Sequence, residues 1–176
     1  MTFFAHALAR GGAVLAPMAG FSDAPFRRLC RRYGSAWAVT EMVSARALAL
    51  GDERGIAIGA PYPGEPDLVI QLFASGPDEA AIAAARLQRR YRPVAFDLNM
   101  GCPVRKIVHR GCGVELMADP ERAGAIVAAV RAATGLPVSV KLRLGRDDVT
   151  VDASADAVVA GGAALVAVHG RTGAQK

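Results

Sequence analysis

The chain has 176 residues, of which 52% are hydrophobic and 21% are charged, and its formal net charge is +5. This balance is typical of a folded globular domain and excludes an intrinsically disordered chain. The positive charge comes almost entirely from arginine, because the 21 basic residues include only Lys106, Lys141 and Lys176 as lysines. Arginine can bind two phosphate oxygens at once, so the charge permits a nucleic-acid partner. A genomic preference for arginine codons would explain it equally well.

Several classes of protein are excluded by what the sequence lacks. Cys30, Cys102 and Cys112 do not have CxxC spacing, so we expect neither a disulfide framework nor a metal site. Free thiols suit a reducing cytoplasm. No apolar run reaches the ~18 residues of a membrane span, and the first twelve residues are too interrupted for a secretory signal. We therefore expect a cytoplasmic protein without membrane or metal.

Strand-length apolar segments alternate with helical patterns along the chain. The expected strands are 13–18, 36–41, 68–73, 94–99, 138–144 and 163–169, and the expected helices are 25–33, 77–91, 120–134 and 152–160. The helix 120–134 has Asp119 as its cap, Pro120 in its first position and Gly135 as its stop. This alternation indicates a parallel sheet covered by helices.

Two α/β architectures fit that order, an open doubly wound sheet and a TIM (β/α)8 barrel. The glycine fingerprint of a dinucleotide-binding fold is missing after the first expected strand, where the sequence is APMAGFSDAP. We therefore predict a TIM barrel, truncated here to about six strands.

The two faces of each expected strand differ in polarity. Because alternate residues point to opposite faces, one face of each strand is apolar and suited to packing under helices. The other face carries Gln71, Asp97, Asn99, Ser139, Lys141, Arg143, His169 and Arg171. In a barrel these side chains converge on the mouth, where TIM-barrel enzymes place their active sites. Unpaired ions there are costly, so we expect a ligand to meet them; the alternative is an internal ion pair of Asp97 with Lys141 or Arg143.

A cysteine follows the fourth expected strand, in the segment DLNMGCP (97–103). At the C-terminal end of a barrel strand, the thiol of Cys102 can act as a nucleophile or as a general acid. A nucleophile needs a base, and His109 and His169 stay open as candidates. The alternative is a small buried apolar cysteine, an interpretation that suits Cys30 better.

Two further segments carry candidate ligand contacts. Lys141, in SVKLRLG, is a lone strand lysine facing the lumen, where a fixed cation can stabilise negative charge on a reduced cofactor or an oxyanion. The first expected strand ends in APMAGFSDAPFR (16–27). Its proline and glycine let the backbone approach a flat ligand, and Met18 offers a soft apolar contact.

Together, APMAGFSDAPFR, DLNMGCP with the lysine and GCG that follow it, SVKLRLG and VHGRT resemble the tRNA-dihydrouridine synthases, in order and spacing, over nearly the whole chain. The resemblance implies an FMN-binding TIM barrel that reduces the C5=C6 bond of uridines in tRNA, usually in the D-loop. NADPH would first reduce the flavin. The target base would leave its stack to enter the pocket, which costs a few kcal/mol and less in a loop.

The resemblance also implies a role for each site residue. Cys102 would protonate C5 from the side of the base opposite the flavin, which delivers hydride to C6. Asn99 and Arg143 would hold the uracil edge. The cofactor would be held by Pro17, Met18 and Ala19 along the isoalloxazine, by Gln71 at its polar edge, and by Lys141 near N1–C2=O with His169 close by.

The resemblance places residues 1–176 as the N-terminal part of the barrel. On this resemblance we expect residues 1–176 to lack the last two strands, the glycine-rich loops for the FMN phosphate and the C-terminal helical RNA-binding domain. We expect this chain alone to self-associate through open sheet edges, and RNA contact to come from exposed arginines of the helix at 27–32. The alternatives are another FMN barrel oxidoreductase, similar to dihydroorotate dehydrogenase, and an inactive truncated fragment.

Overall fold

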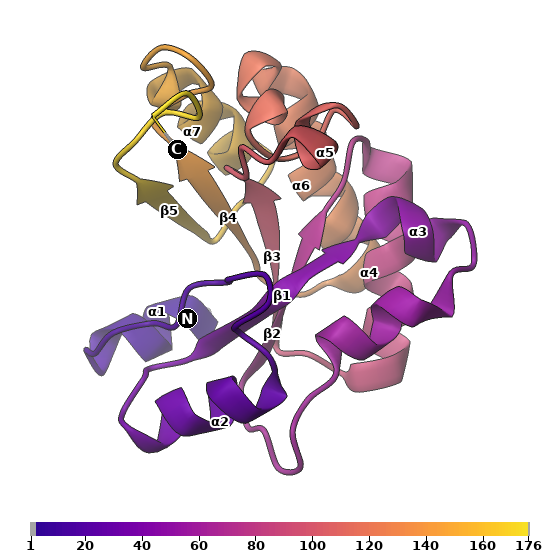
Figure 1. Cartoon of the computed structure of the whole chain (residues 1–176), viewed down its shortest axis with the longest axis vertical. Coiled ribbons are helices and arrows are strands. Elements are labelled where there is room, and N and C mark those ends of the chain that lie inside the picture. Colours follow the sequence, from indigo (N-terminus) through magenta and orange to yellow (C-terminus); the bar gives the residue numbers. More distant parts are fainter. Residues whose placement is uncertain (1–2, 176) are drawn as a thin grey trace.

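The structure is a computed structural model that describes residues 3–175. Within them, five parallel strands form one sheet in the order β1-β2-β3-β4-β5 (Figure 1). The strands are β1 (Ala38–Ser44), β2 (Leu68–Phe73), β3 (Ala95–Met100), β4 (Val138–Arg143) and β5 (Leu165–His169). Parallel neighbours need a crossover connection, and helical segments supply it between each pair. The parallel α/β fold expected from the sequence is confirmed.

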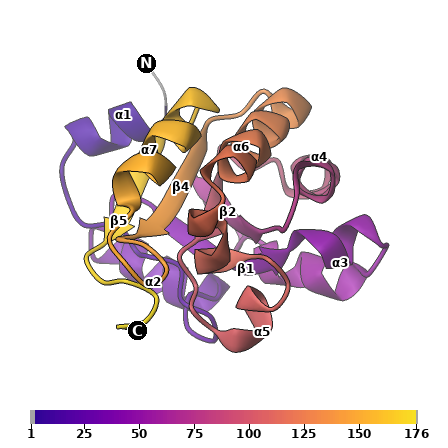
Figure 2. The ribbon, with the colours of Figure 1, turned by 90° about the horizontal axis from the view of Figure 1, so that it is seen from above.

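Helices cover the outer face of the sheet. Figure 2 shows α7, α6, α4 and α3 in succession around this side. Their bounds are α3 (Ala45–Ala49), α4 (Pro77–Tyr91), α6 (Pro120–Thr134) and α7 (Val151–Ala160). Beneath them Ile70, Phe96 and Val140 are completely buried in the main apolar core. This is the apolar face predicted from strand alternation.

The bounds of α6 follow from its terminal residues. The Asp119 carboxylate accepts a hydrogen bond from the backbone N–H of Arg122 at 3.1 Å, which caps the helix. At the other end Gly135 has a φ of 68°, a left-handed conformation that glycine adopts without strain. The predicted limits of this helix and of α4 are both confirmed.

Helix α1 (Phe3–Ala9), which the sequence analysis does not predict, covers the N-terminal end of the inner face. Phe4 and Ala7 are buried there against Trp37, Val39 and Val69. The centroids of the Phe4 and Trp37 rings lie 5.7 Å apart. Because this end of the inner face is filled with apolar side chains, the polar ones gather at the C-terminal ends of the strands.

The first expected strand is wrong in extent. Instead of a regular strand at 13–18, the structure has a single bridge between Leu15 and Ala38. Beyond the bridge, Pro17 has no N–H to donate, and the N–H of Met18 bonds to the Ser22 hydroxyl at 2.9 Å. Backbone hydrogen bonds join residues 13–15 to residues 36–39, and the chain leaves the sheet before Pro17.

Strand β1 begins and ends later than the predicted segment 36–41. Its register against β2 shifts between Val39 and Met42, so that Met42 lies opposite Gln71. A bulge of this kind adds a residue to one strand without a polarity signal. The sequence therefore could not show that Met42 faces inward.

Helix α2 (Ala24–Arg32) is anchored by a buried ion pair. The Arg27 guanidinium donates to both carboxylate oxygens of Glu65 at 2.8 Å and to the backbone carbonyl of Ser22 at 3.1 Å. Removing one member of a buried pair typically costs about 3–5 kcal/mol. Arg27 is therefore a structural residue, and its expected exposure for RNA contact is wrong; Arg28 and Arg32 of the same helix are exposed.

The remaining elements are short, namely η1 (Glu53–Gly59), α5 (Arg105–Val108) and η2 (Gly113–Ala118). Among the helices of residues 3–175, none combines the length and apolar character that a bilayer crossing requires.

Candidate active site

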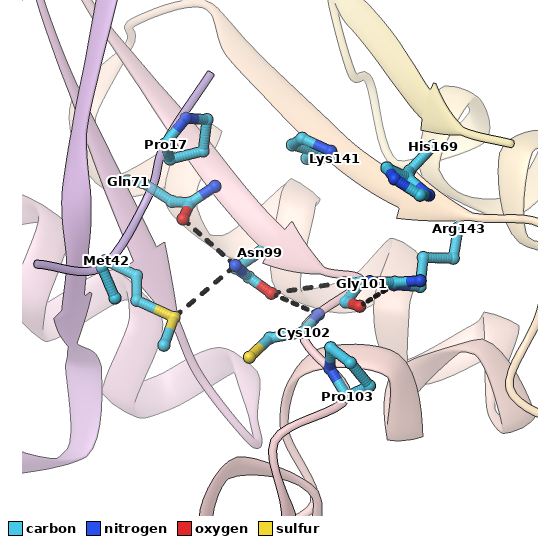
Figure 3. A pocket seen from close by; sticks show the side chains of 11 residues that line it. Pro17, Met42, Gln71, Asn99, Gly101, Cys102, Pro103, Lys141, Arg143 and His169 are labelled. Atoms are coloured by element: carbon cyan, nitrogen blue, oxygen red, sulfur yellow. Dashed lines mark hydrogen bonds between the residues drawn. The ribbon is translucent and has the colours of Figure 1, made fainter. Parts of the chain in front are cut away.

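A pocket opens at the C-terminal ends of the strands (Figure 3). Its lining residues are Pro17, Ala19, Met42, Gln71, Asn99, Gly101, Cys102, Pro103, Lys141, Arg143 and His169. They come from the loop before α2, from all five strands of the sheet, and from the turn after β3. Strand alternation places Gln71, Asn99 and Lys141 on the inner face, because their neighbours in the chain pack under the outer helices.

A buried carboxyl group is bonded to Gln71, one of the residues that line the pocket. Asp97 is 5% exposed and accepts hydrogen bonds from Gln71 Nε2 at 2.6 Å and from Ser139 Oγ at 2.5 Å. Burial raises the pKa of Asp97 to about 6, although hydrogen bonds from Ser139 and Gln71 and the charge of Lys141 act in the opposite direction. At neutral pH the group is therefore mainly ionised. The alternative expected from the sequence, an ion pair of Asp97 with Lys141 or Arg143, is not formed among the described residues.

Cys102 lies in a tight turn that is bonded on both sides. Its backbone N–H donates to Asn99 Oδ1 at 2.9 Å, and its carbonyl accepts from the N–H of Val114 at 3.1 Å. Gly113 passes directly beside it with a φ of 64°. A Cβ at Gly113 would lie 2.5 Å from the Cys102 carbonyl oxygen, so only glycine fits.

Cationic side chains occupy the β4 and β5 side of the pocket. Burial lowers the pKa of Lys141, and the charge of Arg143 lowers it further, while Asp97 raises it. Arg143 itself donates to the backbone carbonyls of Gly101 at 2.8 Å and Thr172 at 3.0 Å, so part of its guanidinium holds the rim together. Lys141 forms neither a hydrogen bond nor an ion pair through its side chain within residues 3–175. It is the cation that stays available to a ligand.

His169 ends β5 at the exposed rim. Partial desolvation, together with the positive charges of Arg143, Lys141 and Arg171, lowers the pKa of His169. The lowered pKa favours the neutral imidazole, which can either donate or accept a hydrogen bond.

The other two cysteines differ from Cys102 in their surroundings. Cys112 is buried, and burial together with the charge of Glu79 raises the pKa of its thiol to about 11. Such a thiol is unreactive at neutral pH. Cys30 is half-buried on α2, away from the residues that line the pocket.

Most of the residues predicted from the sequence meet in this pocket. Those that line it are Pro17, Ala19, Gln71, Asn99, Cys102, Lys141, Arg143 and His169. Met18 does not line it and is 40% exposed, and its backbone N–H and carbonyl are both bonded to the Ser22 hydroxyl. The sequence assigns no role to Met42, whose inward direction depends on the bulge in β1, and does not show that Asp97 is hydrogen-bonded to Gln71 and Ser139.

No group of three or more histidine, cysteine, aspartate or glutamate side chains suited to an ion occurs among residues 3–175.

The fold and the pocket define a class of protein, an α/β chain of TIM-barrel type with a thiol, amides and a lysine at the C-terminal strand ends. Within that class the chain belongs to the dihydrouridine synthase family, whose model matches residues 14–176. The resemblance inferred from the sequence motifs is thus confirmed, and the five-stranded sheet is consistent with part of the family's barrel.

Curated relatives agree with this assignment. The chain is 35% identical to the tRNA-dihydrouridine synthase B of Pseudomonas putida over 165 residues, which cover 93% of this chain and 49% of the relative. It is 38% identical to the tRNA-dihydrouridine synthase B of Xanthomonas axonopodis, over 90% of this chain and 48% of the relative. It is 34% identical to the probable tRNA-dihydrouridine synthase of Aquifex aeolicus, over 94% of this chain and 53% of the relative. The chain spans about half the length of the curated relatives it matches.

Proposed function

We propose that the protein reduces uridine to 5,6-dihydrouridine in the D-loop of cytoplasmic tRNA, with FMN as cofactor and NADPH as reductant. In this proposal residues 1–176 form the N-terminal part of the FMN-binding barrel. The observation that carries it is that Cys102 shares one pocket with Lys141 and the amides of Gln71 and Asn99. Reducing a pyrimidine double bond needs an acid for one carbon, stabilisation of negative charge and groups that orient the ring.

The pocket residues fit the ring system of FMN. Pro17, Ala19 and Met42 supply apolar surface, while Gln71 and Lys141 supply an amide and a cation for a polar edge. When bound, FMN would supply the hydride that adds to C6 of the uracil ring. Gln71 would orient the polar edge of the cofactor, and Lys141 would offset negative charge there.

Cys102 is the proposed proton donor to C5 of the uracil ring. Among the described residues no histidine hydrogen-bonds to its sulfur: His109 is exposed on the surface after α5, and His169 is on β5 at the rim. The thiol gives up its proton, becomes a thiolate and regains a proton from solvent before the next turnover. This arrangement favours an acid over an activated nucleophile, which requires a base within hydrogen-bonding reach.

A basic surface near Cys102 suits the RNA. We call it the α5 basic surface, and it consists of Arg46, Arg105, Lys106, His109 and Arg110. Two surface hollows share Arg110, which therefore connects Arg46 of α3 with the basic side chains of α5 and of the residues that follow it. The cluster begins three residues after Cys102, and the exposed cations can contact phosphates on either side of a base that enters the pocket.

The test is Cys102→Ala in the FMN-loaded protein. The variant is expected to bind tRNA and to accept electrons from NADPH normally, while uridine reduction slows by about 10²-fold or more. Rapid mixing of the reduced protein with unmodified tRNA measures that step, and Cys30→Ala serves as the control. An unchanged rate in Cys102→Ala would remove Cys102 from the reaction. Activity on free orotate but not on tRNA would favour the dihydroorotate dehydrogenase-like alternative.

A further inference from the structure

Asn99 uses all of its hydrogen-bonding groups inside the protein. Its Oδ1 accepts from the backbone N–H of Cys102 at 2.9 Å and of Gly101 at 3.3 Å. Its Nδ2 donates to Gln71 Oε1 at 3.1 Å and contacts the sulfur of Met42 at 3.6 Å. A side-chain amide has two lone pairs and two N–H groups, so each one is engaged.

Figure 3 shows the hydrogen bonds of Asn99 with Gln71 and with the turn at Cys102, and the direction of this chain of hydrogen bonds is fixed from both ends. A backbone N–H can only donate, so the oxygen of Asn99 must face Cys102 and its nitrogen must face Gln71. Gln71 then presents its oxygen to Asn99 and its nitrogen to Asp97, which accepts at 2.6 Å. The other oxygen of Asp97 accepts from Ser139 at 2.5 Å. If either side-chain amide were rotated by 180°, its NH2 group would face another N–H donor. The buried Asp97 carboxylate and the turn at Cys102 therefore fix the orientation of both amides.

We infer that Asn99 is a positioning residue for Cys102, and that Asp97 and Gln71 hold the Asn99 amide in the orientation this requires. The oxygen of Asn99 fixes the peptide N–H of Cys102 while Val114 fixes its carbonyl, so the thiol projects from a turn gripped on both sides. The buried carboxyl of Asp97, which does not line the open pocket, thereby contributes to the site through Gln71. Its mechanistic meaning rests on the proposed role of Cys102, but its test does not.

These bonds limit which hydrogen-bonding groups of Asn99 a ligand can use. Its oxygen is committed to the turn, and its weakest contact is the N–H that faces the Met42 sulfur, a poor acceptor. A ligand that displaces this sulfur gains a bond only if it brings an acceptor such as a carbonyl oxygen. Asn99 therefore contacts a pyrimidine or a flavin as a donor.

Residue-specific amide hydrogen exchange, measured by NMR without cofactor or RNA, tests the first link. In Asn99→Ala the Cys102 amide should exchange about ten-fold faster, which corresponds to the loss of a hydrogen bond worth about 1.4 kcal/mol. Asn99→Asp keeps the acceptor and should keep that rate within about three-fold of the parent. The Val140 amide in β4 reports that the sheet is intact. Equal Cys102 rates in the parent and Asn99→Ala, or equally fast exchange in both variants, would overturn the inference.

Gln71→Leu tests the second link, because it breaks the chain without touching Cys102. It should also speed exchange of the Cys102 amide, whereas Met42→Leu, which removes only the weak sulfur contact, should not. An unchanged rate in Gln71→Leu would overturn the role given to Gln71 and Asp97.

Turnover supplies the matching functional readout. Asn99→Ala should lower kcat by about 10²-fold with little change in the KM for tRNA, since a displacement of ~1 Å at the reacting group can have that effect. A rise in KM at constant kcat would overturn the positioning role. If the exchange rates change as expected but neither parent nor variants form dihydrouridine, the proposed function fails and the positioning of Cys102 stands.

Discussion

Replacing Gly113 by alanine should displace Cys102 and destabilise the fold through a contact that the structure defines. An alanine Cβ would lie 2.5 Å from the Cys102 carbonyl oxygen, 2.9 Å from Ile107 Cγ2 and 3.2 Å from Cys102 Cβ. To reach an ordinary contact distance of about 3.5 Å, the carbonyl would have to retreat by roughly 1 Å. That movement weakens the 3.1 Å bond from the N–H of Val114, which holds the turn.

The expected cost has two parts that a matched variant separates. Alanine in a left-handed conformation costs roughly 1–2 kcal/mol, and steric overlap in a packed site costs about 1–3 kcal/mol more. Gly111 has a φ of 71°, but its added Cβ would meet Ser75 only at 3.7 Å. Gly111→Ala should therefore lose the conformational part alone, and Gly113→Ala should be less stable than Gly111→Ala by about 1–3 kcal/mol.

Urea unfolding of the parent and both variants measures the difference in the free energy of unfolding. Dihydrouridine formation, assayed under conditions where every variant is folded, should fall about 10²-fold in Gly113→Ala and much less in Gly111→Ala. Equal losses of stability in the two variants would refute the steric reasoning. A destabilised but fully active Gly113→Ala would show that the turn tolerates the displacement of Cys102.

Four further predictions concern charge and assembly. Because the folded-state pKa of Asp97 is raised from 3.8 to about 6, its contribution to stability is present below pH 4 and is lost as the pH rises through 6. Between pH 4 and pH 7 the free energy of unfolding of Asp97→Asn should therefore rise by roughly 3 kcal/mol relative to that of the parent, as measured by urea unfolding across that range. If the free energies of the two proteins change in parallel with pH, the raised pKa of Asp97 is contradicted. Lys141→Met should weaken FMN retention and slow cofactor reduction by NADPH by roughly 10²-fold in stopped flow, and equal rates would make the lysine merely structural. Arg105→Glu should weaken tRNA binding and lower the slope of log affinity against log salt, while Arg89→Glu, at the opposite end of the strands, should not; equal slopes would exclude the α5 basic surface from phosphate contact. The 176-residue chain alone should self-associate on a sizing column, because within residues 3–175 β5 pairs on one side only and Val168 is 48% exposed; a sharp monomer peak would contradict this.

The amino-acid pattern is enough to predict the alternation of strands and helices and the face on which each strand carries its polar residues. These properties are local, because period-two polarity and helix caps such as Asp119 and Gly135 act within a few residues. Once the strands are parallel, geometry brings Gln71, Asn99 and Lys141 to one end. That is why the polar strand residues of the pocket could be predicted from the sequence, whereas Met42 could not.

The contact partners of these residues, in contrast, depend on the tertiary structure. The burial of Arg27 depends on Glu65, 38 positions away, and the inward turn of Met42 depends on a bulge that leaves no mark in the polarity pattern. The polarity pattern places Asn99 on the inner face, but it does not show that the side-chain oxygen is bonded to the turn at Cys102. Side-chain amides and ions have several candidate partners in a sequence, and which one they take is fixed by distances that exist only after distant strands have paired.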